Sequence, residues 1–208
     1  MRRAPWLDRR AWFLSGTPAG GKHLEAGCST CLPLRHFMEL RPDLEFVALD
    51  YLDFSAHVPE RVPFFRQNLI TDDLPFPDAT FDSITLMHVM EHLPQFGKAP
   101  AELHRILKPG GRLYVEGPGP RSVLFPSSMN TVTLNFYDDP THVAPLSRGR
   151  INHVFGINGL RPFKSGFNRS LPLIAAMPWS LVKRDWHHFL AGVIHLFGWN
   201  VFVAFKKT

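Results

Sequence analysis

Two short apolar segments near the start of the chain end on residues that could hold a nucleoside. Residues 22–26 run into Gly27, and residues 45–50 end on Asp50. These segments have the length and the endings of buried strands, and the residues between them, 28–40, are predicted to form a helix. Such a βαβ unit places backbone N–H groups and a helix N-terminus beside the end of the first strand. A carboxylate at the tip of the second strand can accept hydrogen bonds from two ribose hydroxyls, so we expect a nucleoside-bearing cofactor.

A pair of cysteines in the same turn has a spacing that is used in redox chemistry. Cys28 and Cys31 form a C-x-x-C pattern at the start of the predicted helix, as in thioredoxin-like pairs. The same spacing supplies half of a zinc site, but the chain contains only these two cysteines. We therefore favour the interpretation that two small residues fill a tight turn.

A histidine-rich segment matches a zinc protease pattern. His88, Glu91 and His92 follow the H-x-x-E-H spacing, in which a helix places both histidines on one face. Here the segment directly follows a predicted strand and Pro94 comes soon after, which leaves too little room for that helix. A metal site is not expected.

Composition limits the function classes. A chain of 208 residues that is 45% hydrophobic and 20% charged is suited to one globular domain. The net charge of +5 is scattered along the sequence and forms no basic stripe, so we do not expect nucleic acid binding. The cysteine content fits a reducing compartment, and the first residues lack the apolar core of a signal peptide, so we expect a cytoplasmic location. The apolar residues 189–205 are too few for a membrane span and include His195 and Asn200.

Hydrophobic patterning predicts an α/β fold with a mostly parallel, doubly wound sheet, because the expected strands alternate with helices. The expected strands are 22–26, 45–50, 64–69, 83–87, 112–116, 160–168 and 200–205. The expected helices are 6–14, 28–40, 99–107 and 150–156, with a broken helix over 175–196. We interpret the chain as a single domain of three parts: an N-terminal helix and linker (1–21), a cofactor-binding half (22–117) and a substrate-side part (118–208).

Six short motifs, in order, resemble those of the class I S-adenosylmethionine-dependent methyltransferases, in particular members that act on small molecules. The motifs are LEAGCS (24–29), LD (49–50), NL (68–69), LPFPD with FD (74–82), EHL (91–93) and LHRILKPGGRL (103–113). Residues 137–143 are similar to a substrate-side loop of part of this family, and residues 198–207 to its last, antiparallel strand. The resemblance implies a three-layer, Rossmann-like fold with a seven-stranded sheet, S-adenosylmethionine as cofactor and a small-molecule or lipid-linked acceptor.

The resemblance also implies which residues contact the cofactor. They are Glu25, Gly27, Cys28, Ser29, Asp50, Tyr51, Asn68, Leu69 and His88. The turn around Gly27 would face the methionine end, Asp50 the ribose and Tyr51 the adenine. Asn68 stands where the family usually has an acid, and its side-chain amide can still accept and donate hydrogen bonds. His88 is expected near the methionine group or the methyl.

A catalytic base is needed only if the acceptor carries a proton on oxygen or nitrogen. We hypothesise that His142 is this base and that Asp139 orients it. An equally good interpretation is that Asp138, Asp139 and Thr141 build a turn around Pro140, which His142 closes with a hydrogen bond.

Two other functions remain open at the level of sequence. A nicotinamide-dependent oxidoreductase would also use Gly27 and Asp50, although the G-x-G-x-x-G pattern is absent and little chain remains for a second nucleotide-binding half. A non-catalytic binding or scaffold protein of the same fold is favoured by Ser29 and Cys31, which replace glycines of the turn and could crowd the cofactor.

Overall fold

The computed structural model describes residues 8–127 and 134–208. Its seven strands form one sheet in the order β3-β2-β1-β4-β5-β7-β6, with β1 to β5 parallel and β7 antiparallel to both β5 and β6. The strands are β1 (Lys22–Ala26), β2 (Glu45–Asp50), β3 (Phe64–Arg66), β4 (Phe81–Met87), β5 (Leu107–Pro118), β6 (Leu160–Phe167) and β7 (Asn200–Lys207). The predicted seven-stranded fold with an antiparallel last strand is confirmed.

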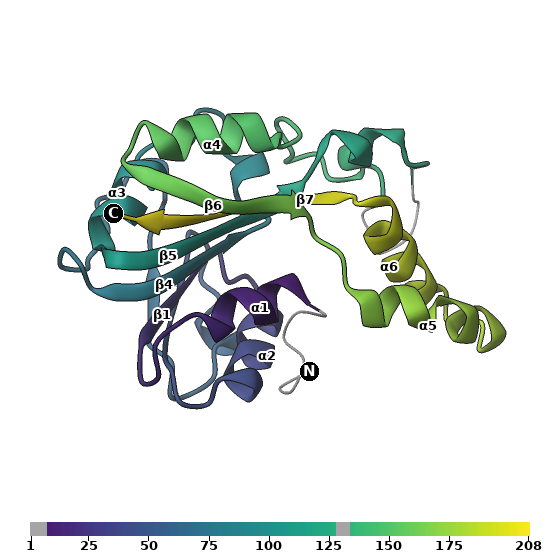
Figure 1. The fold of residues 1–208 in the computed structure, drawn as a ribbon, viewed down its shortest axis with the longest axis horizontal. Helices are drawn as coiled ribbons and strands as arrows, with labels where there is room; N and C mark the ends of the chain where they lie inside the picture. The colour runs from purple at the N-terminus through teal and green to yellow at the C-terminus, as the bar shows by residue number, and fades with distance from the viewer. Residues whose placement is uncertain (1–7, 128–133) are drawn as a thin grey trace.

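Helices cover both faces of the sheet (Figure 1). The α-helices are α1 (Arg9–Ser15), α2 (Leu32–Leu40), α3 (Ala99–Ile106), α4 (Arg148–Gly156), α5 (Leu171–Val182) and α6 (Trp186–Phe197). Short 3-10 helices are η2 (Ser55–His57), η3 (Met90–His92), η4 (Pro120–Leu124) and η5 (Phe136–Asp138). The pair α3 and α4 lies over one face and the pair α1 and α2 over the other, whereas α5 and α6 form a hairpin that projects beyond the end of the sheet.

The alternation of side chains along each strand builds two cores. In β2, Val47 and Leu49 belong to the core under α3 and α4, whereas Phe46 and Ala48 belong to the core under α1 and α2. Successive strand residues point to opposite faces, so a parallel strand in the middle of the sheet is apolar along its whole length. The carboxyl ends of β1, β2 and β4 therefore emerge together from a packed scaffold.

Several predicted boundaries are wrong. The strand expected over 112–116 is the longer β5, which begins five residues earlier, at Leu107, and ends at Pro118. The helix expected over 28–40 begins only at Leu32, because residues 27–31 remain in the turn and Cys31, with φ of 57°, precedes the helix without capping it through its side chain. The strand expected over 64–69 ends at Arg66. The broken helix over 175–196 is two helices, which begin at Leu171 and are separated by three residues. Of the N-terminal helix expected over 6–14, residues 6 and 7 lie outside the described part.

Candidate functional site

A cavity of about 470 Å³ lies at the carboxyl ends of β1, β2 and β4. Its lining residues are Gly27, Ser29, Leu49, Asp50, Tyr51, Leu52, Phe54, Gln67, Asn68, Leu69, Ile70, His88, Val89, His92, Leu93 and Thr141. This is the edge of a parallel sheet at which ligands bind in α/β folds, because loops from several strands meet there. The volume falls in the range of small-molecule and cofactor sites.

The turn after β1 is shaped by a glycine that no other residue can replace easily. Gly27 has φ of 78°, and a Cβ atom placed on it would lie 2.1 Å from Cγ2 of Val89. Ser29 and Cys31 also have positive φ values, 45° and 57°, which cost about 1–2 kcal/mol per residue when no glycine is present. The turn is thus held in a strained conformation at the floor of the cavity.

Asp50 joins the end of β2 to this turn. Its Oδ2 accepts a hydrogen bond from the backbone N–H of Ser29 at 2.9 Å, and its Oδ1 accepts one from the backbone N–H of Leu52 at 3.1 Å. The side chain is buried yet lines the cavity. Each carboxylate oxygen keeps further acceptor capacity, which a ligand with hydroxyl groups can use.

The two cysteines are packed away from the cavity. Both thiols are buried in the core with Leu34 and Phe37 of α2, and neither residue lines the cavity. Burial raises the pKa of the Cys28 thiol, and its hydrogen bond with Cys31 raises it further. A reactive redox cysteine needs the opposite shift. The cysteines therefore fill space in the turn, and the Cys31 side chain, which the sequence suggested could crowd the cofactor, does not line the cavity.

Glu25 is the second-last residue of β1, two residues before Gly27. Its side chain is 2% exposed, and its Oε2 has no hydrogen-bond partner among the described residues. Burial raises the pKa of Glu25 to about 8, and Arg10 offsets this only in part. A buried carboxyl with an unused oxygen is rare in proteins unless a ligand or another function requires it.

The other end of the cavity carries the residues that resemble base contacts. Tyr51 is exposed and Leu69 is buried, and both line the cavity with Asn68. The Asn68 side-chain oxygen accepts a hydrogen bond from the backbone N–H of Ile70 at 2.9 Å, which fixes the orientation of this side chain. Its amide N–H groups make no hydrogen bond within the described part of the chain.

His88 connects the cavity to a buried charge network. Its Nδ1 lies 3.3 Å from Oε1 of Glu91, and its Nε2 lies 3.6 Å from Oε1 of Glu116. Burial favours the neutral ring, but the hydrogen bonds to Glu116 and Glu91 outweigh it and raise the pKa of His88 to about 9. The imidazolium is therefore the form present at neutral pH.

Glu116 at the end of β5 is the centre of this network. It accepts hydrogen bonds from Arg10 Nη2 at 2.5 Å, from the Tyr114 hydroxyl at 2.6 Å and from Asn168 Nδ2 at 2.8 Å. Burial opposes its charge, but Arg10 and His88 outweigh burial and hold the pKa of Glu116 well below its usual range. Arg10 of α1 is thus linked to His88 at the cavity through Glu116 of β5.

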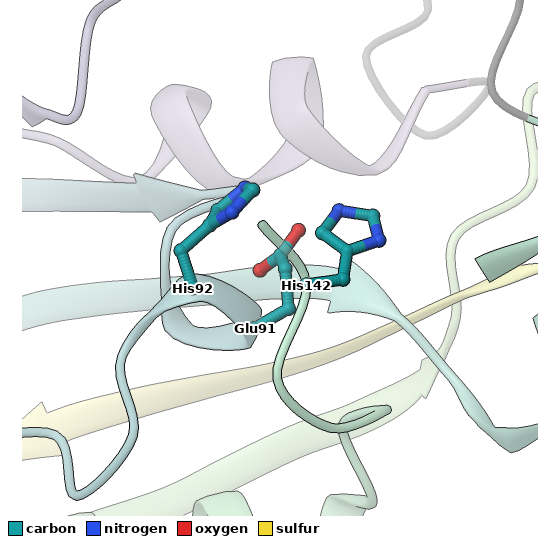
Figure 2. A group of neighbouring side chains, drawn as sticks. All are labelled: Glu91, His92 and His142. Atoms are coloured by element: carbon teal, nitrogen blue, oxygen red, sulfur yellow. The ribbon is translucent and has the colours of Figure 1, made fainter. Parts of the chain in front are cut away.

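A second cavity of about 340 Å³ adjoins the first and shares His88 and His92 with it. The remaining lining residues are Glu91, Asp139, His142, Ile194, Trp199 and Asn200. The side chains of Glu91, His92 and His142 face one another at this cavity (Figure 2). One carboxylate oxygen and one nitrogen of each ring all lie within 4.8 Å of one another. One carboxylate and two imidazoles are a set that could serve acid-base chemistry or hold a divalent metal ion.

Neighbouring groups fix which ring nitrogen of each histidine carries the proton. His142 Nδ1 lies 2.6 Å from the carbonyl oxygen of Phe136, which can only accept, so Nδ1 donates. The hydroxyl of Thr141 donates to Asp139 at 2.6 Å, so its oxygen accepts from His92 Nδ1 at 2.9 Å. In the neutral rings, Nε2 of both histidines therefore carries a lone pair.

Comparison with known families agrees with this geometry. The sequence model described as the methyltransferase domain matches residues 24–115, which run from within β1 to within β5 and contain most of the first cavity. Residues 24–115 are thus similar to the methyltransferase domain.

Relatives in this methyltransferase family match parts of the chain. The demethylmenaquinone methyltransferase of Symbiobacterium thermophilum is 34% identical over 125 residues, 54% of this chain and 49% of that protein. The ubiquinone/menaquinone biosynthesis C-methyltransferase of Marinomonas sp. is 46% identical over 54 residues, 26% of this chain and 21% of that protein. The chain thus spans about half the length, or less, of these relatives.

Solved structures share the fold over the whole chain. A SAM-dependent methyltransferase from Archaeoglobus fulgidus superposes with a TM-score of 0.68 at 18% identity, covering 100% of this chain and 95% of that chain. At this identity the similarity shows the methyltransferase fold and no more.

The structure brings together most of the residues that the methyltransferase resemblance selects. Those at the first cavity are Gly27, Ser29, Asp50, Tyr51, Asn68, Leu69 and His88, and those at the second are His88, Asp139 and His142. Glu25 and Cys28 line neither cavity. Asp139 does not bond to His142 Nδ1: its Oδ2 lies 3.8 Å from Nε2, and the orienting contact comes from Phe136.

Residues that act through long-range contacts could not be predicted from the sequence. Arg10 and Glu116 are 106 residues apart in the chain, and their ion pair follows no local pattern. The sequence placed Glu91 and His92 in a protease pattern and in the EHL motif, and neither pattern predicted that they lie beside His142, fifty residues later. One available signal was the acid at the end of a predicted central strand, since Glu116 occupies the same strand-end position as Asp50.

Proposed function

We propose that this chain transfers a methyl group from S-adenosylmethionine to an acceptor bound in the second cavity. The observation that carries the proposal is the pair of adjoining cavities, because the first offers Asp50 and the Gly27 turn to a cofactor and the second offers a base to an acceptor. When bound, S-adenosylmethionine supplies an electrophilic methyl group on a positively charged sulfur.

The residues of the first cavity suit this cofactor. Asp50 would accept hydrogen bonds from the ribose hydroxyls, and its two bonds to the backbone already hold it in place. The amide N–H groups of Asn68 would donate to ring nitrogens of adenine, beside Leu69. Glu25, with its unused Oε2, would gain a partner in the ammonium group of the methionine part.

The second cavity would position the acceptor and take its proton. Nε2 of His142 carries a lone pair in the neutral ring, and we assign to it the proton of an O–H or N–H acceptor. The acceptor would form its bond to the methyl carbon as the carbon–sulfur bond breaks, which would leave S-adenosylhomocysteine. The Asp139 carboxylate, 3.8 Å from Nε2, would stabilise the imidazolium that results. Alignment of the acceptor with the methyl group can supply much of the rate.

The acceptor is proposed to be a small molecule. Relatives with this domain carry names that describe methylation of demethylmenaquinone, and the second cavity is of a size for part of such a molecule. Its walls combine apolar side chains, Ile194 and Trp199, with polar groups that can fix an orientation.

Calorimetry with S-adenosylmethionine and S-adenosylhomocysteine, with NAD as the comparison ligand, tests the proposal. We expect both sulfur compounds to bind and NAD not to bind. Asp50→Asn should weaken binding roughly 10- to 100-fold, because hydrogen bonds to a charged acceptor contribute about 1.5–3 kcal/mol. Asp73→Asn is the matched control, since Asp73 is exposed and pairs with Lys98 away from the cavity.

Two results would contradict the assignment. Tight binding of NAD would favour an oxidoreductase. An Asp50→Asn variant that stays folded by circular dichroism and binds S-adenosylmethionine as tightly as the Asp73→Asn variant would remove the ribose contact.

A further inference from the structure

The α5–α6 hairpin exposes an unusual amount of apolar surface. No charged residue occurs among the twelve residues of α5, and Ser180 is the one residue of this helix that is buried. The two helices pack closely on each other, because Gly192 of α6 leaves room where a Cβ would lie 2.1 Å from Cγ of Met177. The outer faces of the hairpin remain without a partner in the described chain.

The exposure is concentrated at the turn between the helices, residues 179–186, which we call the hairpin tip. Trp179, Val182 and Trp186 are 64%, 72% and 59% exposed. The tip also holds two exposed cations, Lys183 and Arg184, and Nζ of Lys183 lies 5.0 Å from the centre of the Trp179 ring. Tryptophans beside basic residues are typical of segments that lie in the interface of a membrane.

The acidic residue of the tip does not neutralise its two cations. Asp185 is the tip's one acid, and its carboxylate accepts a hydrogen bond from the backbone N–H of His188 and pairs with Nδ1 of the same residue at 2.7 Å. Asp185 thus caps the N-terminus of α6. Lys183 and Arg184 have no acidic partner among the described residues.

The hairpin is suited to lying on a membrane surface. No helix in the described part of the chain is long and apolar enough to cross a bilayer. A projecting tip that combines tryptophans with unpaired cations matches the apolar boundary and negative headgroups of an anionic lipid layer.

The base of the hairpin forms part of the acceptor site. Ile194 of α6 lines the second cavity together with Trp199, which lies two residues after the end of α6. Leu196 and Phe197 at the end of α6 are exposed, and η4 beside them exposes Leu124. Exposed apolar side chains therefore occur at the tip and again at the end of α6, next to the cavity wall.

We propose that the hairpin tip docks on an anionic lipid surface and that the second cavity takes its methyl acceptor from that surface. The docking stands on the hairpin alone, whereas the source of the acceptor rests on the proposed methyl transfer. The acceptor is thereby assigned to the class of amphiphiles: a polar group to be methylated, joined to an apolar part that partitions into lipid.

Vesicle sedimentation with the full chain tests the docking. We expect the protein to bind vesicles of phosphatidylcholine mixed with phosphatidylglycerol, and to bind vesicles of phosphatidylcholine alone far more weakly. Replacing Lys183 and Arg184 by Ser should reduce binding about fivefold per charge, with less dependence on salt in what remains. Trp179→Gln combined with Trp186→Gln should abolish sedimentation.

The matched control is Ile157→Gln. Ile157 is 71% exposed and Val182 is 72% exposed, so the two positions are matched in exposure. Ile157 precedes the start of β6, which pairs with the end of β7. The hairpin leads into the start of β7, so Ile157 lies at the opposite end of this strand pair. Val182→Gln should weaken vesicle binding and Ile157→Gln should not. Equal binding by these two variants, or no binding by the unaltered protein to the anionic vesicles, would overturn the proposal.

Two further measurements separate the alternatives. If light scattering shows a dimer that the double tryptophan variant loses, and vesicles do not compete with it, a second copy covers the tip and the proposal is wrong. Calorimetry with S-adenosylmethionine reports on the proposed function separately: the tip variants should keep the affinity of the unaltered protein. Vesicle binding without binding of S-adenosylmethionine would contradict the proposed methyl transfer and leave the proposed docking supported.

Discussion

At the scale of single residues, the site depends on protons whose positions are set by neighbours. His142 shows this most clearly, since the Phe136 carbonyl holds the proton on Nδ1 and leaves Nε2 to act. His92 is held in the same way by Thr141 and, through it, by Asp139. The hydrogen bond from Thr141 lowers the pKa of Asp139, which keeps this acceptor ionised at neutral pH.

We predict that the neutral rings of His92 and His142 are the Nδ1–H tautomers. Long-range nitrogen–proton NMR correlations should show both Nε2 atoms as unprotonated. With an identified acceptor, His142→Gln should lower kcat about 10²- to 10⁴-fold, the range for loss of a general base, and leave cofactor affinity unchanged. Loss of activity on chelation of divalent ions, with recovery when a metal is returned, would contradict the base role and indicate that the cluster holds a metal.

Glu25 is predicted to lower stability. Its pKa of about 8 lies above the ordinary value of 4.5, so between these pH values the folded state binds a proton that the unfolded state lacks. Stability therefore falls as pH rises through this window, by up to about 1.4 kcal/mol per pH unit. Glu25→Gln should raise the free energy of unfolding at pH 8 by roughly 1–3 kcal/mol and weaken S-adenosylmethionine binding.

Urea denaturation at pH 5 and pH 8 measures this effect. Glu45→Gln serves as the control, since Glu45 begins β2 and is exposed. A Glu25→Gln variant that is less stable than the unaltered protein at pH 8 would mean that the buried carboxyl has a partner that compensates for its burial.

At the scale of elements, the turn after β1 decides whether the first cavity can form. Gly27→Ala combines a left-handed φ with a contact between the new Cβ and Val89. We expect a loss of about 2–4 kcal/mol of stability together with a loss of cofactor binding. Val89→Ala in the same chain should recover only the part caused by the contact, because the backbone strain remains.

Denaturation of the two single variants and the double variant measures this coupling. Gly156→Ala is the control, because Gly156 lies at the end of α4 with open space around its Cα, and we expect a change of less than about 1 kcal/mol. If Val89→Ala restored all of the lost stability, strain at Gly27 would not contribute.

Most elements could be predicted from sequence because their signals are local. Apolar runs such as 45–50, bounded by turn residues, gave the strands, and the ends of α3 and β7 were predicted within two residues. The start of α2 could not be predicted in this way, since Ser29 and Thr30 are good capping residues and only the strained conformation of Cys31 delays the helix. Local preference was overridden there by the backbone conformation of the turn.

The site was predicted in part for a similar reason. Asp50 and Gly27 stand at strand ends, where a motif fixes their place. The neighbours of His142 could not be predicted, because the loop that carries it has no periodic pattern and its contacts with Glu91 and His92 depend on the whole fold. The residues of the first cavity could therefore be predicted from the sequence better than those of the second.

At the scale of the whole molecule, one ion pair, between partly exposed Arg10 and fully buried Glu116, fixes the first helix to the centre of the sheet. Arg10→Leu would leave Glu116 buried beside Tyr114 and Asn168 without its main counter-charge. We predict a loss of about 3–5 kcal/mol of stability, as for other buried pairs that lose one partner. Arg61→Leu, at an exposed position, is the control, and urea denaturation measures both.

A second change tells whether the charge or the contact matters. Arg10→Lys keeps the charge and should restore part of the stability. If the Arg10→Leu variant unfolded at the same urea concentration as the Arg61→Leu variant, other groups would compensate the charge of Glu116. The ion pair between Arg10 and Glu116 would then not hold α1 on the sheet.

The place of β7 in the sheet also dictates an order of assembly. This strand lies between β5 and β6 yet comes after both in the chain, with the hairpin in between. During synthesis β5 and β6 are therefore made while the strand that unites them is missing, and each keeps a bare edge. The sheet closes only through pairings between distant parts of the chain, which predisposes the protein to fold slowly and to need protection while the ribosome is still at work.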